Sequence, residues 1–170
     1  MDRQLIEQTK QEYQKLLDEN RLASALPLIR QAAHWSDVDS QILAERIYLH
    51  GRYGHPKSDR EGFEYARLAA MNEDGQSMYD LALLYQNGAG IEHDLTRAKY
   101  WLEKAARYEF APAIDALGLL YLQGRGTERN ACYARDLFIR AKEKGFDPDT
   151  VQKHIAMAEK MMEKAGSQKD

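Results

Sequence analysis

Two stretches of the sequence share one pattern: LALLYQNGAG at residues 81–90 and LGLLYLQGRG at residues 117–126. A looser copy, AERIYLHGRYG, stands at residues 44–54, so the pattern returns about every 36 residues. Self-similarity at such a period is the signature of proteins built from stacked repeats. The apolar columns continue back to residues 25, 28 and 32, which indicates a fourth, degenerate unit near the N-terminus.

Each unit is predicted to contain two helices joined by a glycine turn. Leu81, Leu84 and Tyr85 fall at i, i+3 and i+4 spacing, which places them on one face of a helix. The glycine pair that follows supplies the positive φ angles that end a helix and reverse the chain. The second helix alternates small and large apolar residues, and we expect its Trp101 to lie in the core.

The same reasoning along the whole chain predicts helices and no strand. The expected helices span residues 2–18, 22–34, 39–50, 59–72, 76–87, 94–108, 111–123, 130–144 and 148–165. They form a degenerate unit at about 2–39, units at 40–76, 77–112 and 113–148, a cap helix at 149–165 and a flexible tail at 166–170. The expected fold class is all-α, a single-domain solenoid of antiparallel helix pairs closed by a C-terminal cap helix.

Composition and charge limit the classes of function. The chain has 170 residues, 44% of them hydrophobic and 30% charged, which fits one folded domain. The net charge of −3 is spread along the chain and offers no basic patch for nucleic acid. The longest apolar run, residues 117–122, is far shorter than the roughly 20 residues of a membrane span. With one cysteine, Cys132, and no signal-peptide core at the start, we expect a cytoplasmic protein.

The repeat resembles the Sel-one-like repeat, a relative of the tetratricopeptide repeat. The resemblance rests on the column of Tyr85 and Tyr121, on the Gly-x-Gly turns, and on the series Ala98, Trp101 and Ala105. It implies a right-handed α-solenoid in a family with many bacterial members. The resemblance also implies an adaptor or scaffold without catalytic residues.

The chain departs from this family pattern in three places. The dipeptide Arg52-Tyr53 lengthens the first turn, and Gly62 replaces the usual alanine of its column. Glu73 and Glu109 stand where a glycine commonly closes the second helix. These departures weaken the predicted boundaries of the units and leave the predicted fold unchanged.

No group of residues in the sequence indicates catalysis or a cofactor. A phosphate-binding loop follows a strand and occurs once, whereas these glycine turns recur between helices. The five histidines and Cys132 lack the tight ligand pairs of a zinc site. Cys132 and Ser77 occupy scaffold columns, so neither is a predicted nucleophile. We therefore expect no enzyme activity, no cofactor and no metal.

The predicted binding site consists of surface positions that are not required for packing between the repeats. In stacked helix pairs the first helices line the concave side, where positions outside the core are free to vary. These positions are Arg46, Leu49, His50, Tyr79, Asp80, Leu83, Gln86, Asn87, Asp115, Leu119, Leu122 and Gln123. An apolar strip with a polar rim is typical of a protein or peptide groove. In the alternative, a tightly curled array packs these leucines on each other.

The sequence thus predicts a non-catalytic module that binds another protein or a peptide through its concave groove, as an adaptor or scaffold. The alternative is a dedicated inhibitor, such as an immunity protein that neutralises a secreted bacterial toxin; an enzyme ranks last. The expected partners include neither nucleic acid nor membrane. The expected state is a monomer or a weak homo-oligomer.

Overall fold

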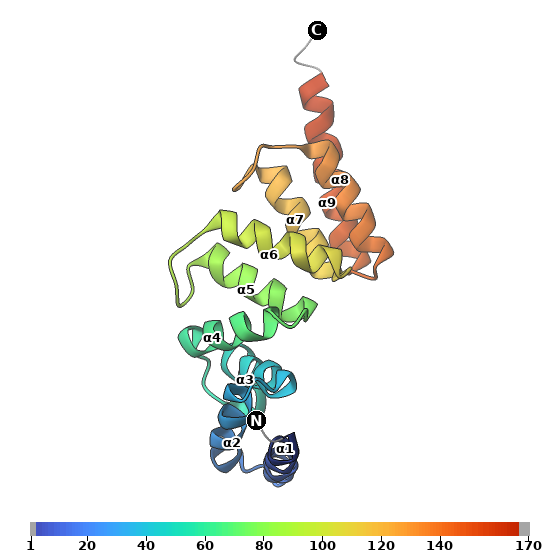
Figure 1. The fold of residues 1–170 in the computed structure, drawn as a ribbon. Coiled ribbons are helices and arrows are strands. Elements are labelled where there is room, and N and C mark those ends of the chain that lie inside the picture. Colours follow the sequence, from blue (N-terminus) through green and yellow to red (C-terminus); the bar gives the residue numbers. More distant parts are fainter. Residues whose placement is uncertain (1–2, 167–170) are drawn as a thin grey trace.

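The computed structural model describes residues 3–166, and within this range it contains nine α-helices and no strand (Figure 1). The helices are α1 (Arg3–Asp18), α2 (Leu22–His34), α3 (Val38–His50), α4 (Asp59–Ala70), α5 (Gly75–Asn87), α6 (Leu95–Arg107), α7 (Ala111–Gln123), α8 (Ala131–Glu143) and α9 (Pro148–Gly166), with a short 3-10 helix, η1 (Arg52–Gly54), after α3. Every predicted helix agrees with the structure to within two residues at each end. Of the predicted tail, Gly166 ends α9 and the remainder lies outside the described residues.

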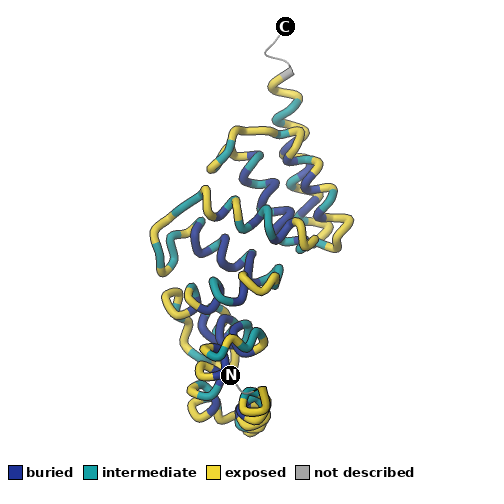
Figure 2. Tube along the Cα trace, viewed as in Figure 1, coloured by how far each residue is buried: buried dark blue, intermediate teal, exposed yellow. Residues whose placement is uncertain are grey.

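The helices form a solenoid in which each one packs mainly against its neighbours in the chain. Four pairs, α1 with α2, α3 with α4, α5 with α6 and α7 with α8, follow one another from one end of the molecule to the other (Figure 1). Helix α9 packs on α8 and covers the C-terminal end of the stack. Figure 2 shows the buried positions on the facing sides of the helices and the exposed ones along the outside. The predicted all-α solenoid is confirmed.

Columns of small residues allow the helices to approach closely. Ala98, Ala105, Ala134 and Ala141 are all fully buried in the second helices of their units. At Gly118 an added Cβ atom would lie 2.5 Å from Cε1 of Phe138, closer than atoms can pack. The size of these residues therefore sets the distance between the helices.

The departure at Gly62 has the same explanation. A Cβ atom there would lie 2.1 Å from Cδ2 of Leu49, so the usual alanine of this column would displace that leucine. Leu49 occupies the space that the glycine leaves, and it packs against the core. The glycine is thus a packing requirement of this one unit.

The apolar core consists of two clusters that meet on α4. Tyr65 belongs to the N-terminal cluster, which joins α1 to α4, and its neighbour Ala66 belongs to the C-terminal cluster, which extends to α9. Trp101 was predicted to lie in the core, but it is only half-buried and packs against the edge of the C-terminal cluster. Its ring contacts Tyr100 and lies 5.1 Å from the Lys104 ammonium, both on its own helix.

Local chemistry fixes the ends of the helices. Asp37 and Asp74 cap α3 and α5, since their carboxylates accept hydrogen bonds from the backbone N–H groups three residues ahead. Gly88 ends α5 in the left-handed region, with φ of 67°. Glu73 and Glu109 also have positive φ, of 67° and 59°, so the backbone keeps the conformation that a glycine adopts more easily.

We predict that the second glycine of a turn matters more where the turn contacts the preceding unit. Gly54 and Gly90 both have positive φ, but a Cβ atom at Gly54 meets nothing within 4 Å, whereas one at Gly90 lies 2.7 Å from the Asp59 carbonyl oxygen. Gly54→Ala should cost about 1 kcal/mol from backbone conformation alone, and Gly90→Ala about 1–3 kcal/mol more because the backbone of α4 must move. Urea unfolding of both variants measures the difference, and equal losses of stability would contradict the packing role.

Candidate binding groove

A hollow of about 670 Å³ lies on the side of the first helices. Its lining residues are Arg46 and His50 from α3, Arg52 from η1, Gln76 from α5 and Phe110 at the start of α7. Counted as helix pairs, α3–α4, α5–α6 and α7–α8 all contribute to one concavity, the last through Phe110 at the N-cap of α7. A ligand in this position would contact the array across two unit boundaries.

A second hollow of about 420 Å³ continues from the first toward the N-terminus. The two share Arg46 and Arg52, and the second is also lined by residues of α1, α3 and η1, among them Lys10, Asp39 and Tyr53. We call the two hollows together the groove. Its length covers the first helices from α1 to the start of α7.

A carboxylate beneath the groove connects α3 to α5. Asp80 is only 6% exposed, and its Oδ2 atom lies 2.9 Å from Nε2 of His50. The Gln76 amide also donates to this oxygen, at 2.9 Å. Both donors line the groove, so the buried charge holds two groove side chains in place.

A similar pair connects α7 to α9. Asp115 is 4% exposed, and its Oδ1 atom lies 2.8 Å from Nδ1 of His154. Burial raises the pKa of the Asp115 carboxyl, and the hydrogen bond from His154 opposes that change. His154, on the cap helix α9, is thus the half-buried partner of this acid.

The most deeply buried acid lies between α3 and α5. Glu45 is fully buried, and its carboxyl contacts the hydroxyl of Ser77. The same hydroxyl donates to Oδ2 of Asp74 at 2.7 Å. Because a hydroxyl has one proton, a protonated Glu45 completes this chain by donating to Ser77, which in turn donates to Asp74.

The surroundings of Glu45 favour that protonated form. Burial raises its pKa to about 8, and the nearby carboxylates of Asp80 and Asp74 act in the same direction. The Ser77 hydroxyl opposes the change, and so does Arg46, the next residue in the chain. At neutral pH Glu45 is therefore mostly uncharged, and it does not cancel the charge of Arg46 in the groove.

The preceding unit contains the same arrangement with a different donor. The hydroxyl of Tyr13 lies 3.1 Å from Oγ of Ser40, which donates to Oδ2 of Asp37 at 2.6 Å. In both units a buried side chain from one first helix reaches the aspartate-serine cap of the next first helix. Tyr13 keeps its proton at neutral pH because burial raises its pKa further, whereas Glu45 depends on its raised pKa.

The structure separates the twelve predicted site residues into three groups. His50, Asn87 and Gln123 are exposed, and Arg46, Leu49, Tyr79, Leu83, Gln86 and Leu119 are half-buried. Asp80, Asp115 and Leu122 are buried, which corrects their assignment to the partner surface. Leu122 is 2% exposed in the C-terminal core cluster, and the two aspartates are covered by their histidine partners.

The groove also contains residues that the sequence reasoning did not select. Arg52 and Gln76 line it, and so does Phe110, which lies 5.7 Å from the Tyr79 ring, centroid to centroid. A signal for two of them was visible in the sequence. Arg52 belongs to the lengthened first turn, and Phe110 stands at the cap position of α7, where α3 and α5 have aspartates.

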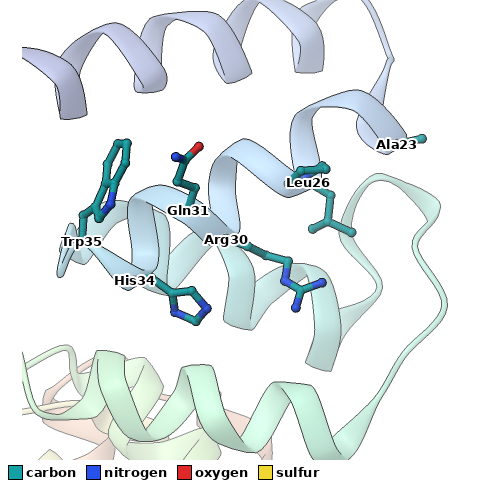
Figure 3. A pocket seen from close by; sticks show the side chains of 7 residues that line it. Ala23, Leu26, Arg30, Gln31, His34 and Trp35 are labelled. Carbon is teal, nitrogen blue, oxygen red and sulfur yellow. The ribbon is translucent and has the colours of Figure 1, made fainter.

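Another hollow, of about 500 Å³, lies along α2 (Figure 3). All of its lining residues belong to α2 or directly follow it, so no second element closes around a ligand. Figure 3 shows Arg30 and His34 pointing away from Trp35 and Gln31. Because these polar groups do not converge, the groove is the stronger candidate.

Within residues 3–166 no three His, Cys, Asp or Glu side chains gather to hold a metal ion. In the same range, no helix combines the length and apolar character needed to cross a membrane.

The Sel1 repeat family matches this chain at residues 42–74, 75–107 and 111–146, which together make up more than half of it. The chain is 32% identical over 112 residues to the chitin synthase regulator SKT5 of Saccharomyces cerevisiae, covering 65% of this chain and 16% of that protein. It is 28% identical over 142 residues to chitin synthase regulatory factor 3 of Schizosaccharomyces pombe, covering 79% of this chain and 15% of that protein.

A similar fold occurs in a crystal structure of a Sel1 repeat protein from Oxalobacter formigenes. The TM-score is 0.70 at 24% identity, over 74% of this chain and 36% of that one. The chain spans about a sixth of the length of the two fungal relatives and about a third of this bacterial structure. The likeness to the bacterial structure shows the fold alone.

We predict that Glu45 makes stability depend on pH. Its folded pKa of about 8 lies above the ordinary value of 4.5, so folding takes up a proton between these values. Stability is full below about pH 4.5 and falls as the pH rises toward 8, by up to about 1.4 kcal/mol for each unit of pKa shift. Glu45→Gln should remove this fall, because the amide is neutral and still donates to Ser77.

Urea unfolding between pH 5 and pH 8 measures this effect. The exposed Glu92→Gln variant makes the same change of charge and should keep the pH dependence of the wild type. Parallel stability curves for wild type and Glu45→Gln would contradict the role of Glu45.

Proposed function

The chain belongs to the Sel1 repeat family, and on that premise we propose that it is a non-catalytic adaptor or scaffold that binds a protein or peptide in its groove. One observation carries the proposal: a single hollow is lined by residues from α3, α5 and the N-cap of α7, which belong to three consecutive helix pairs. Repeat arrays bind partners on extended surfaces of this kind, because adjacent units present their variable positions side by side. The groove accordingly offers a continuous surface for an elongated partner.

The groove side also carries apolar surface that the core does not use. Leu83 on α5 lies two helical turns after the groove residue Gln76, on the same face of that helix, at the edge of the groove. It is half-buried and belongs to neither core cluster, whereas Leu119 on α7 packs against the C-terminal cluster. A few apolar anchors at the centre of an interface contribute most of its binding free energy. Leu83 is therefore the residue that we propose as the apolar anchor.

The names of the fungal relatives support a regulatory adaptor. Both are described as regulators of chitin synthase, and this chain matches only a sixth of their length. The likeness supports binding to a protein partner. An inhibitor of a secreted toxin would use the same surface, but the regulator names favour the adaptor.

We further propose that the protein acts in the cytoplasm as a monomer or weak homo-oligomer. The exposed thiol of Cys132, the single cysteine of the chain, is compatible with a reducing compartment. Its partners are proposed to be proteins or peptides, with neither nucleic acid nor membrane among them.

We predict that Leu83→Ser abolishes partner capture and leaves the fold intact. Loss of a central apolar anchor costs about 2 kcal/mol or more, which is roughly a thirtyfold loss of affinity. The measurement is affinity purification of the tagged full chain from the cell that produces it, with proteins identified by mass spectrometry. Equal helicity and melting temperature of variant and wild type are required first.

Met71→Ser is the matched control for this prediction. Met71 follows α4 and is 63% exposed, and it lies outside the groove. This control variant should retain every partner of the wild type. Loss of partners from both variants, or from neither, would contradict binding through the groove.

A further inference from the structure

Cationic side chains outnumber acidic ones in the lining of the groove, with Lys10, Arg46 and Arg52 against Asp39 alone. Within the described residues, neither Arg46 nor Arg52 forms an ion pair, and the Arg52 guanidinium lies 5.2 Å from the centroid of the Tyr53 ring. Both arginines line both hollows of the groove, so they lie at its centre. This charge is local, because the whole chain has a net charge of −3.

The acids near these arginines are already occupied. Asp39 lies 2.7 Å from the Lys10 ammonium, which also contacts Asp37 at 3.2 Å. Asp80 accepts from His50 and Gln76, as described above. Glu45, beside Arg46, is kept mostly uncharged by its burial. None of these four acids forms an ion pair with either guanidinium group.

Two departures from the repeat pattern meet in the same place. The first is the longer turn between α3 and α4, which brings in Arg52 and the exposed Tyr53, whose φ is 56°. A left-handed conformation is unfavourable for tyrosine, so the backbone of this turn is strained at Tyr53. The insertion cannot be explained by packing, because Arg52, Tyr53 and Gly54 are all exposed.

The second departure is Phe110. It occupies the cap position of α7 without a side-chain hydrogen bond, where an aspartate would typically add about 1 kcal/mol of stability. Its half-buried ring lines the groove beside Gln76. The chain thus replaces a stabilising polar cap by an aromatic surface at the end of the cationic hollow.

We propose that the groove recognises an acidic peptide segment, whose carboxylates bind Arg46 and Arg52 and whose apolar side chains pack on Phe110 and Tyr53. This inference rests on the proposed function and names the chemistry of the partner. Guanidinium groups bind carboxylates through paired hydrogen bonds, which favours arginine over lysine for this role. His50 and Gln76 line the same hollow, and both are held by hydrogen bonds to Asp80.

The test uses three short fluorescent peptides in which leucine alternates with glutamate, glutamine or lysine. Fluorescence anisotropy with the full chain should show binding of the glutamate peptide, and this binding should weaken as salt rises. The glutamine peptide should bind at least roughly tenfold more weakly, since hydrogen bonds to charged groups are the stronger ones. The lysine peptide should not bind.

Charge-reversal variants then locate the site. Arg52→Glu should weaken binding of the glutamate peptide by roughly tenfold or more, and the double variant Arg46→Glu, Arg52→Glu should instead bind the lysine peptide. Arg60→Glu on α4, outside the groove, is the matched control and should bind like the wild type. Because Arg52 is exposed, its single variant remains informative if the double variant is destabilised.

Equal binding of the glutamate and glutamine peptides, absence of binding by folded wild type, or unchanged binding by Arg52→Glu would overturn the inference. Its failure can be distinguished from failure of the proposed function. If Leu83→Ser loses the cellular partner while Arg52→Glu retains it, the groove binds a partner that is not acidic. If both variants retain the partner, the groove is not the binding site.

Discussion

The whole structure depends on the close approach of successive helix pairs. One pair cannot bury its own apolar face, so each unit is stable only where the next unit covers it. The distance between the two helices of a unit is set by residues with little or no side chain, as at Gly62 against Leu49 and at Gly118 against Phe138. Between units, the turn at Gly90 fits closely against Asp59 of α4. The repeat in the sequence is therefore mainly a repeat of residue sizes, and the variable surface follows from what these columns leave free.

This regular packing is interrupted between α3 and α5 by polar groups. The two apolar clusters meet on α4, and nearby the buried Glu45 reaches Ser77 and the cap of α5. Ionising a buried carboxyl costs free energy, and this cost raises the pKa of Glu45. Glu45 therefore stays mostly protonated at neutral pH, and the stability of the fold depends on pH. At the same junction Asp80 holds His50 of α3 and Gln76 of α5, so a second polar contact between these helices fixes two side chains of the groove.

The helices were predictable because their ends are determined locally. Glycine turns and aspartate caps act within a few residues, and a sequence displays them directly. The site was less predictable because exposure depends on the superhelix. Leu83 and Leu122 look alike in the sequence, but only Leu83 remains outside the core. Asp80 is buried because His50 reaches it from another unit, 30 residues away, which no local pattern indicates.

The departures from the repeat pattern have different causes. Those that packing or backbone geometry explains belong to the scaffold, and one that neither explains is a candidate for function. Gly62 is explained by Leu49, which occupies its space, and Glu73 keeps a left-handed turn that glycine would adopt more easily. The inserted Arg52 is explained by neither packing nor backbone geometry, since it is exposed and its turn contains a strained tyrosine. A repeat array can tolerate such a residue anywhere on its surface. Its position beside Arg46, in a hollow that three units share, is what points to a ligand.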